Sequence, residues 1–483
     1  MSCLPEILRT RRNVLICAAG MAALTHVPFA TAACLPSGMD VGVPTRLSAA
    51  GPSPAVRAPA ISIFLDVSGS MAGYVARARS APLRPSPGRA PAQPRGPDVS
   101  EPRTFNDLVQ SLPQLGAAVA DRVAILSFGR MIKPLAIADL SRATRPEFYS
   151  EQDSRIQDAL ARMDALPADE IGLLVTDLFL TGDEIFGGAA AIRAPLARLL
   201  DSGRAIALMG IRSGFAGTIY DIPVVRTYAL ASERPFYLLA SGPAPLLARL
   251  MRRIETELLT PLAPPPDGLP RYHATLFTHT PLPGGPAVLA MRAREPAQSI
   301  PPDALDLSLG AAFLKFPAAA GTATAEVPLG TLGEPFALLP DLFRIEQSLW
   351  LAPPRSGGLS ACQDRWIEAR SFPAVFELGT AAAGAPMLTI GGPNLAQLTP
   401  NVVFLAGARV IGTGLSDAPA STGWARAWNL ETREAEAYTA TRPQMFRTLN
   451  LREIVSMLEG LVRDRMEPTV VGEAILALQV SRR

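Results

Sequence analysis

The residues best able to do chemistry lie at the end of one apolar run. Residues 61–65 read Ile-Ser-Ile-Phe-Leu, and Asp66, Ser68 and Ser70 follow directly, with Gly69 between the two serines. Alternate residues at a strand end lie on one side, and glycine permits a tight turn, so we expect one carboxylate and two hydroxyls to converge. Hard oxygen donors of this kind suit Mg²⁺, Mn²⁺ or Ca²⁺ rather than zinc.

A second carboxylate ends another apolar run. Asp177 follows residues 171–176, which read Ile-Gly-Leu-Leu-Val-Thr. Ligands bind at the carboxyl ends of the strands of a doubly wound sheet, and two carboxylates at that edge repel each other unless a cation lies between them. The sequence therefore predicts a divalent metal site that includes Asp66 and Asp177. A capped turn is the simpler alternative, because serine and aspartate also favour helix N-caps.

The elements that must position these residues alternate along the chain. The predicted strands are 61–65, 123–128, 171–176, 205–211 and 236–240, and the predicted helices are 104–120, 154–166, 189–200 and 245–258. Continuous apolar strands separated by helices predict an α/β domain over residues 60–258, with a doubly wound, mostly parallel, Rossmann-like sheet. The proline-rich insert 80–103 cannot pack or form a helix, so we expect it to be disordered.

Residues 58–258 resemble the von Willebrand factor A (VWA) domain and its metal-ion-dependent adhesion site. The resemblance rests on Asp66-Val-Ser68-Gly-Ser70-Met71, on Thr176-Asp177 and on the strand order. It implies that Ser68 and Ser70 coordinate Mg²⁺ through their hydroxyls, while Asp66 and Asp177 hold it directly or through water. It also implies an open coordination position for an acidic side chain of a protein partner.

The chain departs from the family pattern at two positions. The family's loop threonine is replaced by Ser154, which opens the segment Ser-Arg-Ile-Gln-Asp-Ala-Leu. Serine keeps the hydroxyl, so Ser154 is the expected ligand, with neighbouring Asp153 as the alternative. Leu178 follows Asp177 where the family usually has glycine. Neither departure removes the metal-site prediction.

The second half of the chain has a different pattern. Residues 259–270 form a proline-rich linker, and residues 271–483 contain short alternating segments separated by proline and glycine. This pattern predicts a β-rich, sandwich-like domain. A late helix at 451–465 and a last strand at 473–480 are expected to complete it.

The first residues predict export. Residues 1–33 combine an arginine-rich start, an apolar stretch and small residues suited to signal peptidase, and residues 10–15 resemble a twin-arginine signal. Residues 34–59 form a linker rich in proline, serine and glycine. We therefore expect an exported protein of the periplasm or cell envelope, without a transmembrane span in the mature chain.

Two cysteines, Cys34 and Cys362, would remain after removal of a signal peptide. They could form a disulfide in an oxidising compartment, or stay as two free thiols. Residues 31–34 also resemble a lipoprotein box, in which Cys34 would carry a lipid. The sequence leaves these alternatives open.

Composition argues against nucleic acid as a partner and against common enzyme classes. The net charge of +2 is small, Lys133 and Lys315 are the only lysines, and the arginines form no basic stripe. The chain contains no nucleophile elbow and no phosphate-binding loop, and the spacing of His273 and His279 matches no common zinc signature. We therefore predict no enzymatic activity.

Three hypotheses on function follow. The first is an interaction module that binds a divalent metal and, through it, an acidic group on a protein partner. The second is a structural subunit of an envelope assembly, in which the metal only stabilises the fold. The third, less favoured, is a metal-dependent hydrolase.

Overall fold

A computed structural model describes most of the chain after the predicted export signal and linker. The described residues are 57–76, 104–178, 189–220, 227–262, 264–265, 267–279, 286–300, 312–329, 334, 336–351, 366–370, 374–381, 385–391, 393–441 and 443–481. The predictions for residues 1–33, for most of the linker 34–59 and for the whole insert 80–103 lie outside these ranges. So do both cysteines, Cys34 and Cys362.

The described residues of the first half form an α/β domain around a seven-stranded mixed sheet. Its strands are, in spatial order, β3 (Ile132–Pro134), β2 (Ala120–Phe128), β1 (Ala58–Asp66), β4 (Ile171–Thr176), β6 (Thr227–Gly242), β5 (Ala205–Tyr220) and β7 (Tyr272–Phe277). Strand β1 lies in parallel between β2 and β4, whereas the other described ladders of this sheet are antiparallel. The prediction of a mostly parallel sheet is therefore wrong. Only residues 221–226 separate β5 from β6, and a parallel crossover needs about a dozen residues or more.

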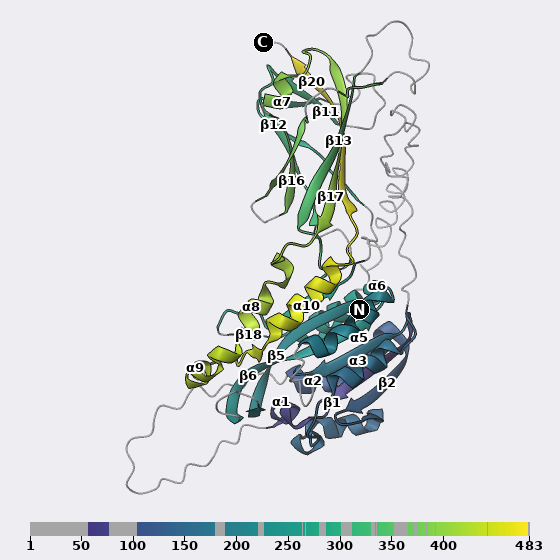
Figure 1. Cartoon of the computed structure of the whole chain (residues 1–483), viewed down its shortest axis with the longest axis vertical. Coiled ribbons are helices and arrows are strands. Elements are labelled where there is room, and N and C mark those ends of the chain that lie inside the picture. The colour runs from purple at the N-terminus through teal and green to yellow at the C-terminus, as the bar shows by residue number, and fades with distance from the viewer. Residues whose placement is uncertain are drawn as a thin grey trace, which may run out of the picture.

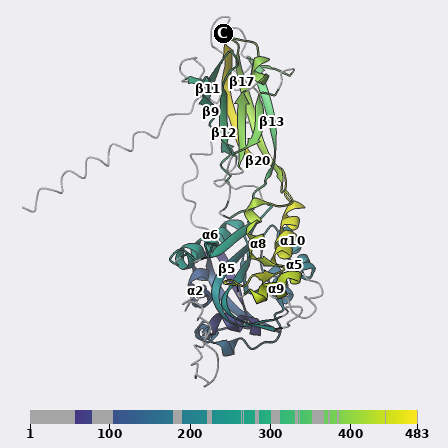
Figure 2. The same ribbon diagram turned by 90° about the vertical axis from the view of Figure 1, so that its left-hand side faces the viewer.

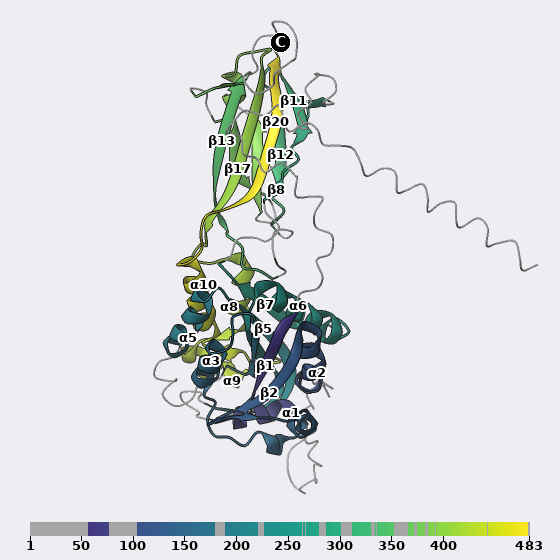
Figure 3. The same cartoon turned by 90° about the vertical axis from the view of Figure 1, so that its right-hand side faces the viewer.

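Helices cover both faces of this sheet (Figures 1 and 3). On one face, α2 (Thr104–Val119) and α6 (Ala244–Ile254) pack over Ile63 and Leu65 of β1. On the other, α3 (Ile156–Asp164) and α5 (Ala189–Asp201) pack over Phe64. Successive side chains of a strand point to opposite faces, so the apolar residues of β1 contribute alternately to the cores on the two faces of the sheet.

The second half contains two facing sheets. The first has the order β10 (Gln298–Ile300), β11 (Ala312–Pro317), β20 (Thr469–Ser481), β17 (Val403–Gly414), β13 (Leu342–Leu351) and β14 (Ile367–Glu368), with β8 (Ala287–Val288) also paired to β20. The second has the order β15 (Phe376–Thr380), β16 (Pro386–Gly391), β12 (Thr322–Glu326) and β9 (Arg292–Arg294). Residues such as Phe316, Ile390 and Phe404 from both sheets share one apolar core. This sandwich extends away from one end of the α/β domain (Figures 1 and 2).

The chain crosses between the two parts in a way that the sequence did not indicate. After β17 it returns to the α/β domain, where it forms α8 (Trp424–Trp428), α9 (Ala435–Ala440) and α10 (Leu451–Arg463) before β20 re-enters the sandwich. Helix α10 presents apolar residues at helical spacing to the core of α3 and α5. The predicted helix at 451–465 is thus present, but it packs on the α/β domain and not within the β-rich part.

Strand β7 gives a second correction to the predicted boundary. The β-rich domain was expected to begin at residue 271, yet β7 pairs antiparallel with β5 at the edge of the first sheet. The alternating pattern of an edge strand does not say which sheet it joins, because that choice depends on distant partners.

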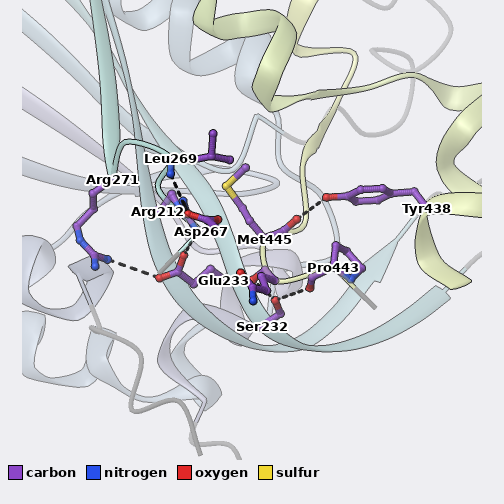
Figure 4. Close-up of polar contacts among 10 residues, drawn as sticks. Arg212, Ser232, Glu233, Asp267, Leu269, Arg271, Tyr438, Pro443 and Met445 are labelled. Carbon is purple, nitrogen blue, oxygen red and sulfur yellow. Dashed lines mark hydrogen bonds and ion pairs between the residues drawn. The ribbon is translucent and has the colours of Figure 1, made fainter. Parts of the chain in front are cut away.

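A buried ion network lies where the segment between β17 and β20, the returning segment, contacts the α/β domain (Figure 4). The Arg212 guanidinium donates to both carboxylate oxygens of Asp267, at 2.9 and 2.8 Å, and also contacts Glu233. Arg271 lies 3.6 Å from the other carboxylate oxygen of Glu233. The backbone of Glu233 in turn bonds to the Gln444 carbonyl and the Phe446 amide. This network therefore joins β5, β6, the predicted linker and the returning segment.

Among the described residues, no helix combines the length and apolarity needed to cross a membrane.

Candidate functional site

Asp66 lies at the carboxyl end of β1 and is fully buried. Its Oδ2 accepts hydrogen bonds from the Ser154 hydroxyl at 2.7 Å and the Thr176 hydroxyl at 2.8 Å. Its Oδ1 accepts the backbone N–H of Ser68 at 2.9 Å. Because β1 lies between β2 and β4, its end is reached both by the loop after β1 and by the end of β4.

The two signature serines lie in the turn that follows. Ser68 Oγ and Ser70 Oγ are 3.0 Å apart, and both residues are buried. The turn is held by Glu151, whose carbonyl accepts the Gly69 N–H at 2.9 Å. Ser68 precedes the short 3₁₀ helix Gly69–Met71 without capping it through its side chain. The Ser68 hydroxyl thus faces Ser70 and does not cap the helix, although Asp66 does bond to the Ser68 N–H as in a capped turn.

Ser154 reaches the site and its neighbour does not. The Ser154 hydroxyl contacts Asp66, whereas the Asp153 carboxylate pairs with the exposed Arg130 at 3.3 Å. Ser154 lies just before α3, whose N-terminus makes no side-chain cap hydrogen bond. Of the two alternatives left open by the sequence, the structure brings Ser154 to Asp66.

Asp177 follows β4 and is also buried. The next residue, Leu178, has a φ of 58°, in the left-handed region that glycine adopts without strain. This is the position at which the family usually has glycine. The Leu178 N–H donates to Thr176 Oγ1 at 3.2 Å, and its buried side chain joins the core beside α3. The chain thus turns sharply directly after Asp177, although a leucine and not a glycine occupies the left-handed position.

Two residues of the cluster were not among the predicted ligands. Thr176 belongs to the motif that carries the resemblance, but its hydrogen bond to Asp66 follows only from the three-dimensional register of β1 and β4. Arg234 of β6 was missed entirely, and its Nη1 lies 3.2 Å from Asp177 Oδ2. One signal could have revealed it. An arginine next to the apolar run 236–240 must find a buried partner if the strand continues through it.

The electrostatics of the cluster follow from burial and from the two carboxylates. Desolvation, together with the charge of Asp177, raises the pKa of Asp66 to about 6, although hydrogen bonds from Ser68 and Ser154 oppose this. A nearby cation favours the ionised form of a carboxylate. A cation close to Asp66 would therefore oppose this rise in pKa, and Arg234, which pairs with Asp177, already places one positive charge at the cluster.

The donor set is of the kind that hard divalent cations use. Asp66, Ser68, Ser70, Ser154 and Asp177 all offer oxygen. Across the described ranges, no group of three or more histidine, cysteine, aspartate or glutamate side chains is placed to hold a metal ion, and this cluster combines two carboxylates with hydroxyls. The residues thus fit an oxygen-coordinated ion better than zinc.

A buried tyrosine and the two histidines of the described chain make other contacts. Tyr74 is buried beneath the site, where its hydroxyl donates to the Pro235 carbonyl at 2.6 Å. His273 lies in β7 and stacks on Trp424, with ring centroids 5.3 Å apart and an interplanar angle of 8°. His279 lies beyond the end of β7. Neither histidine belongs to the strand-end cluster.

Comparison with known proteins adds no relative. No family model, no curated protein and no solved structure matches this chain. What the cluster does must therefore be argued from its own residues.

Proposed function

We propose that the α/β domain is a divergent VWA-like module that binds a divalent cation at the strand-end cluster. The observation that supports this most is the convergence of Ser154 and Thr176 on Asp66, beside the paired hydroxyls of Ser68 and Ser70. These residues come from three separate stretches of the chain. A cluster assembled in this way is hard to explain as a local turn.

The arrangement of β1, β2 and β4 supports the same proposal. Parallel strands with helices on both faces bring their carboxyl ends to one edge, where doubly wound folds bind ligands. The antiparallel strands β6, β5 and β7 are a departure from a doubly wound sheet. They lie on the other side of β4 and leave the strand ends of β1 and β4 adjacent.

In this proposal Ser68 and Ser70 bind Mg²⁺, Mn²⁺ or Ca²⁺ through their hydroxyls. Ser154 orients Asp66, and Asp66 and Asp177 hold the ion directly or through water. The bound cation would supply an open position for an acidic side chain of a protein partner. We assign no catalytic residue, and we place the protein outside the cytoplasm, in the periplasm or cell envelope, on the basis of the predicted export signal.

Metal-dependent capture tests this function. The purified protein is immobilised and exposed to a bacterial envelope extract in Mg²⁺ or in EDTA, with the Asp66→Ala variant beside it. We expect a partner retained by the unsubstituted protein in Mg²⁺ alone. Retention that is unchanged by EDTA and by the substitution would contradict the proposal.

A second candidate is favoured by the burial of the site. The five residues of the proposed site, Asp66, Ser68, Ser70, Ser154 and Asp177, are only 0 to 5% exposed, so a bound ion could serve the fold alone. In that case a chelator would lower the melting temperature without releasing any partner. Measuring both effects on one preparation separates the two functions.

A further inference from the structure

A buried arginine lies against the proposed metal site. The Arg234 side chain is 7% exposed, and its Nη1 is 3.2 Å from Oδ2 of Asp177, whose side chain is fully buried. Neighbouring residues of a strand point to opposite faces. Accordingly, Glu233 joins the network of Arg212, while Arg234 points toward the strand-end cluster.

Aromatic rings hold this arginine in place. Its guanidinium carbon lies 5.2 Å from the ring centroid of Phe215 and 6.0 Å from that of Tyr74. The Tyr74 hydroxyl is itself bonded to the Pro235 carbonyl on the same strand. A guanidinium packed against aromatic rings is favoured by their negative faces and has few other rotamers open to it. Arg234 is therefore a fixed charge of the site and not a mobile surface side chain.

The charges of the cluster can be counted. With both carboxylates ionised, Asp66 and Asp177 carry two negative charges and Arg234 one positive charge. A divalent cation would bring the total to a net positive charge, and a carboxylate from a partner would then bring it to zero. Buried sites favour neutrality, because an unpaired charge in a low-dielectric interior is costly.

We propose that Arg234 is a built-in counter-cation that weakens the binding of a divalent metal alone and strengthens the binding of metal and carboxylate together. This inference rests on the proposed function, which it extends to the regulation of the same site. Metal and acidic partner would then bind in mutual dependence, because each raises the affinity for the other by the same factor. The site would load fully only when the partner is present.

The test is calorimetric titration of the purified protein with Mg²⁺, with and without sodium acetate as the probe carboxylate, at constant ionic strength. We expect acetate to tighten Mg²⁺ binding by the unsubstituted protein. We expect Arg234→Met to bind Mg²⁺ about tenfold more tightly than the unsubstituted protein without acetate, since a fixed charge at this range shifts an ionic equilibrium by about one unit or more. In that variant acetate should have a smaller effect, and Arg234→Lys should behave like the unsubstituted protein.

Arg204→Met is the matched control. Arg204 is equally buried, but its guanidinium donates to the backbone carbonyls of Met163 and Leu166 and to no carboxylate of the site. Its loss should leave the Mg²⁺ affinity unchanged. The comparison separates the charge of Arg234 from the general effect of removing a buried arginine.

Each outcome decides the inference. If the unsubstituted protein binds Mg²⁺ and Arg234→Met binds no more tightly, Arg234 is not a counter-cation, while the proposed function stands. If only Arg234→Met binds, the counter-cation is confirmed and the proposed function fails for the natural chain. If neither binds, both fail. If Arg234→Met does not fold, the test is the effect of acetate on the unsubstituted protein. Acetate that tightens its Mg²⁺ binding supports the inference, and acetate that leaves its Mg²⁺ affinity unchanged overturns it.

Discussion

At the scale of single residues, Asp66 is the centre of the strand-end cluster. It is fully buried, and hydroxyl groups from two distant stretches, Ser154 and Thr176, donate to the same carboxylate oxygen. A buried carboxylate is costly unless it accepts hydrogen bonds or faces a cation. The geometry of the proposed metal site therefore depends on the donors that orient Asp66.

Ser154→Ala removes one of these donors. We expect the Mg²⁺ affinity to fall about tenfold or more, the usual cost of losing a group that orients a metal-binding residue. Calorimetric titration measures this directly. Ser111→Ala is the control, because that exposed hydroxyl donates only to a carbonyl within its own helix. Equal affinities in the two variants would remove Ser154 from the site.

His273 gives a pH-dependent prediction. Burial lowers the pKa of His273 from 6.5 to about 4. Between these two pH values, His273 is protonated in the unfolded chain and neutral in the folded chain. The free energy of unfolding is therefore unaffected by this residue's protonation above pH 6.5, and it decreases as the pH falls from 6.5 toward 4. Between pH 7 and pH 4.5, the urea midpoint of the unsubstituted protein should fall by more than that of His273→Phe. The phenylalanine ring can still stack on Trp424 but does not take up a proton. Equal falls in both would contradict this assignment.

The sequence predicted the strand-end residues because their signal is local. Asp66, Ser68 and Ser70 follow one apolar strand, and Asp177 follows another, so the rule that ligands bind at strand ends was enough to group them. Arg234 could not be predicted in the same way. Its partner is fixed by the pairing of β6 beside β4, and no local pattern encodes that choice.

At the scale of elements, β6 couples the site to the rest of the domain. Glu233 and Arg234 are adjacent, and each is paired with an opposite charge on its own side of the strand. Buried ions remain tolerable only while their partners stay in place. Removing one charge should therefore be far more costly than removing an exposed pair.

Glu233→Gln tests this. The amide keeps the shape but leaves the buried Arg212 and Arg271 with less compensation, so we expect a loss of about 3 kcal/mol in the free energy of unfolding. Glu346→Gln, which breaks the exposed pair with Arg344, should cost about 1 kcal/mol or less. Urea unfolding measures both. Similar small losses would mean that the network adds little to stability.

The sequence predicted the individual elements better than their pairing. The apolar runs at 61–65, 123–128 and 171–176 lie within β1, β2 and β4. The run at 205–211 covers only the start of β5, because the strand continues as a hairpin with β6 through residues of mixed character. Strands buried on both faces look alike whether their neighbours are parallel or antiparallel, so the mixed sheet was not foreseen.

At the scale of the whole molecule, the two parts are joined by more than a linker. The chain leaves the sandwich after β17, adds α8, α9 and α10 to the α/β domain and returns as β20. Leu458 of α10 is fully buried in the same core as Leu174 of β4. Residues late in the chain thus complete the core of a domain built mainly from its first half. A single boundary along the sequence cannot divide the chain into these two parts.

Leu458→Ala should therefore destabilise the α/β domain, by about 2–5 kcal/mol for a large-to-small change in a packed core. Hydrogen exchange should become faster in β4, far away in the sequence. Ser456→Ala, on the exposed side of the same helix, should have little effect. Faster exchange confined to α10 and its immediate neighbours would show that the helix is only loosely attached.

The most direct test of the account is calorimetric titration of the purified protein with Mg²⁺ in the presence of sodium acetate, beside the Asp66→Ala variant. We predict saturable binding by the unsubstituted protein and its loss in the variant, with circular dichroism showing that both are folded. Absence of binding by the folded, unsubstituted protein would contradict the account. The strand-end cluster would then be a structural device held by hydrogen bonds and by Arg234.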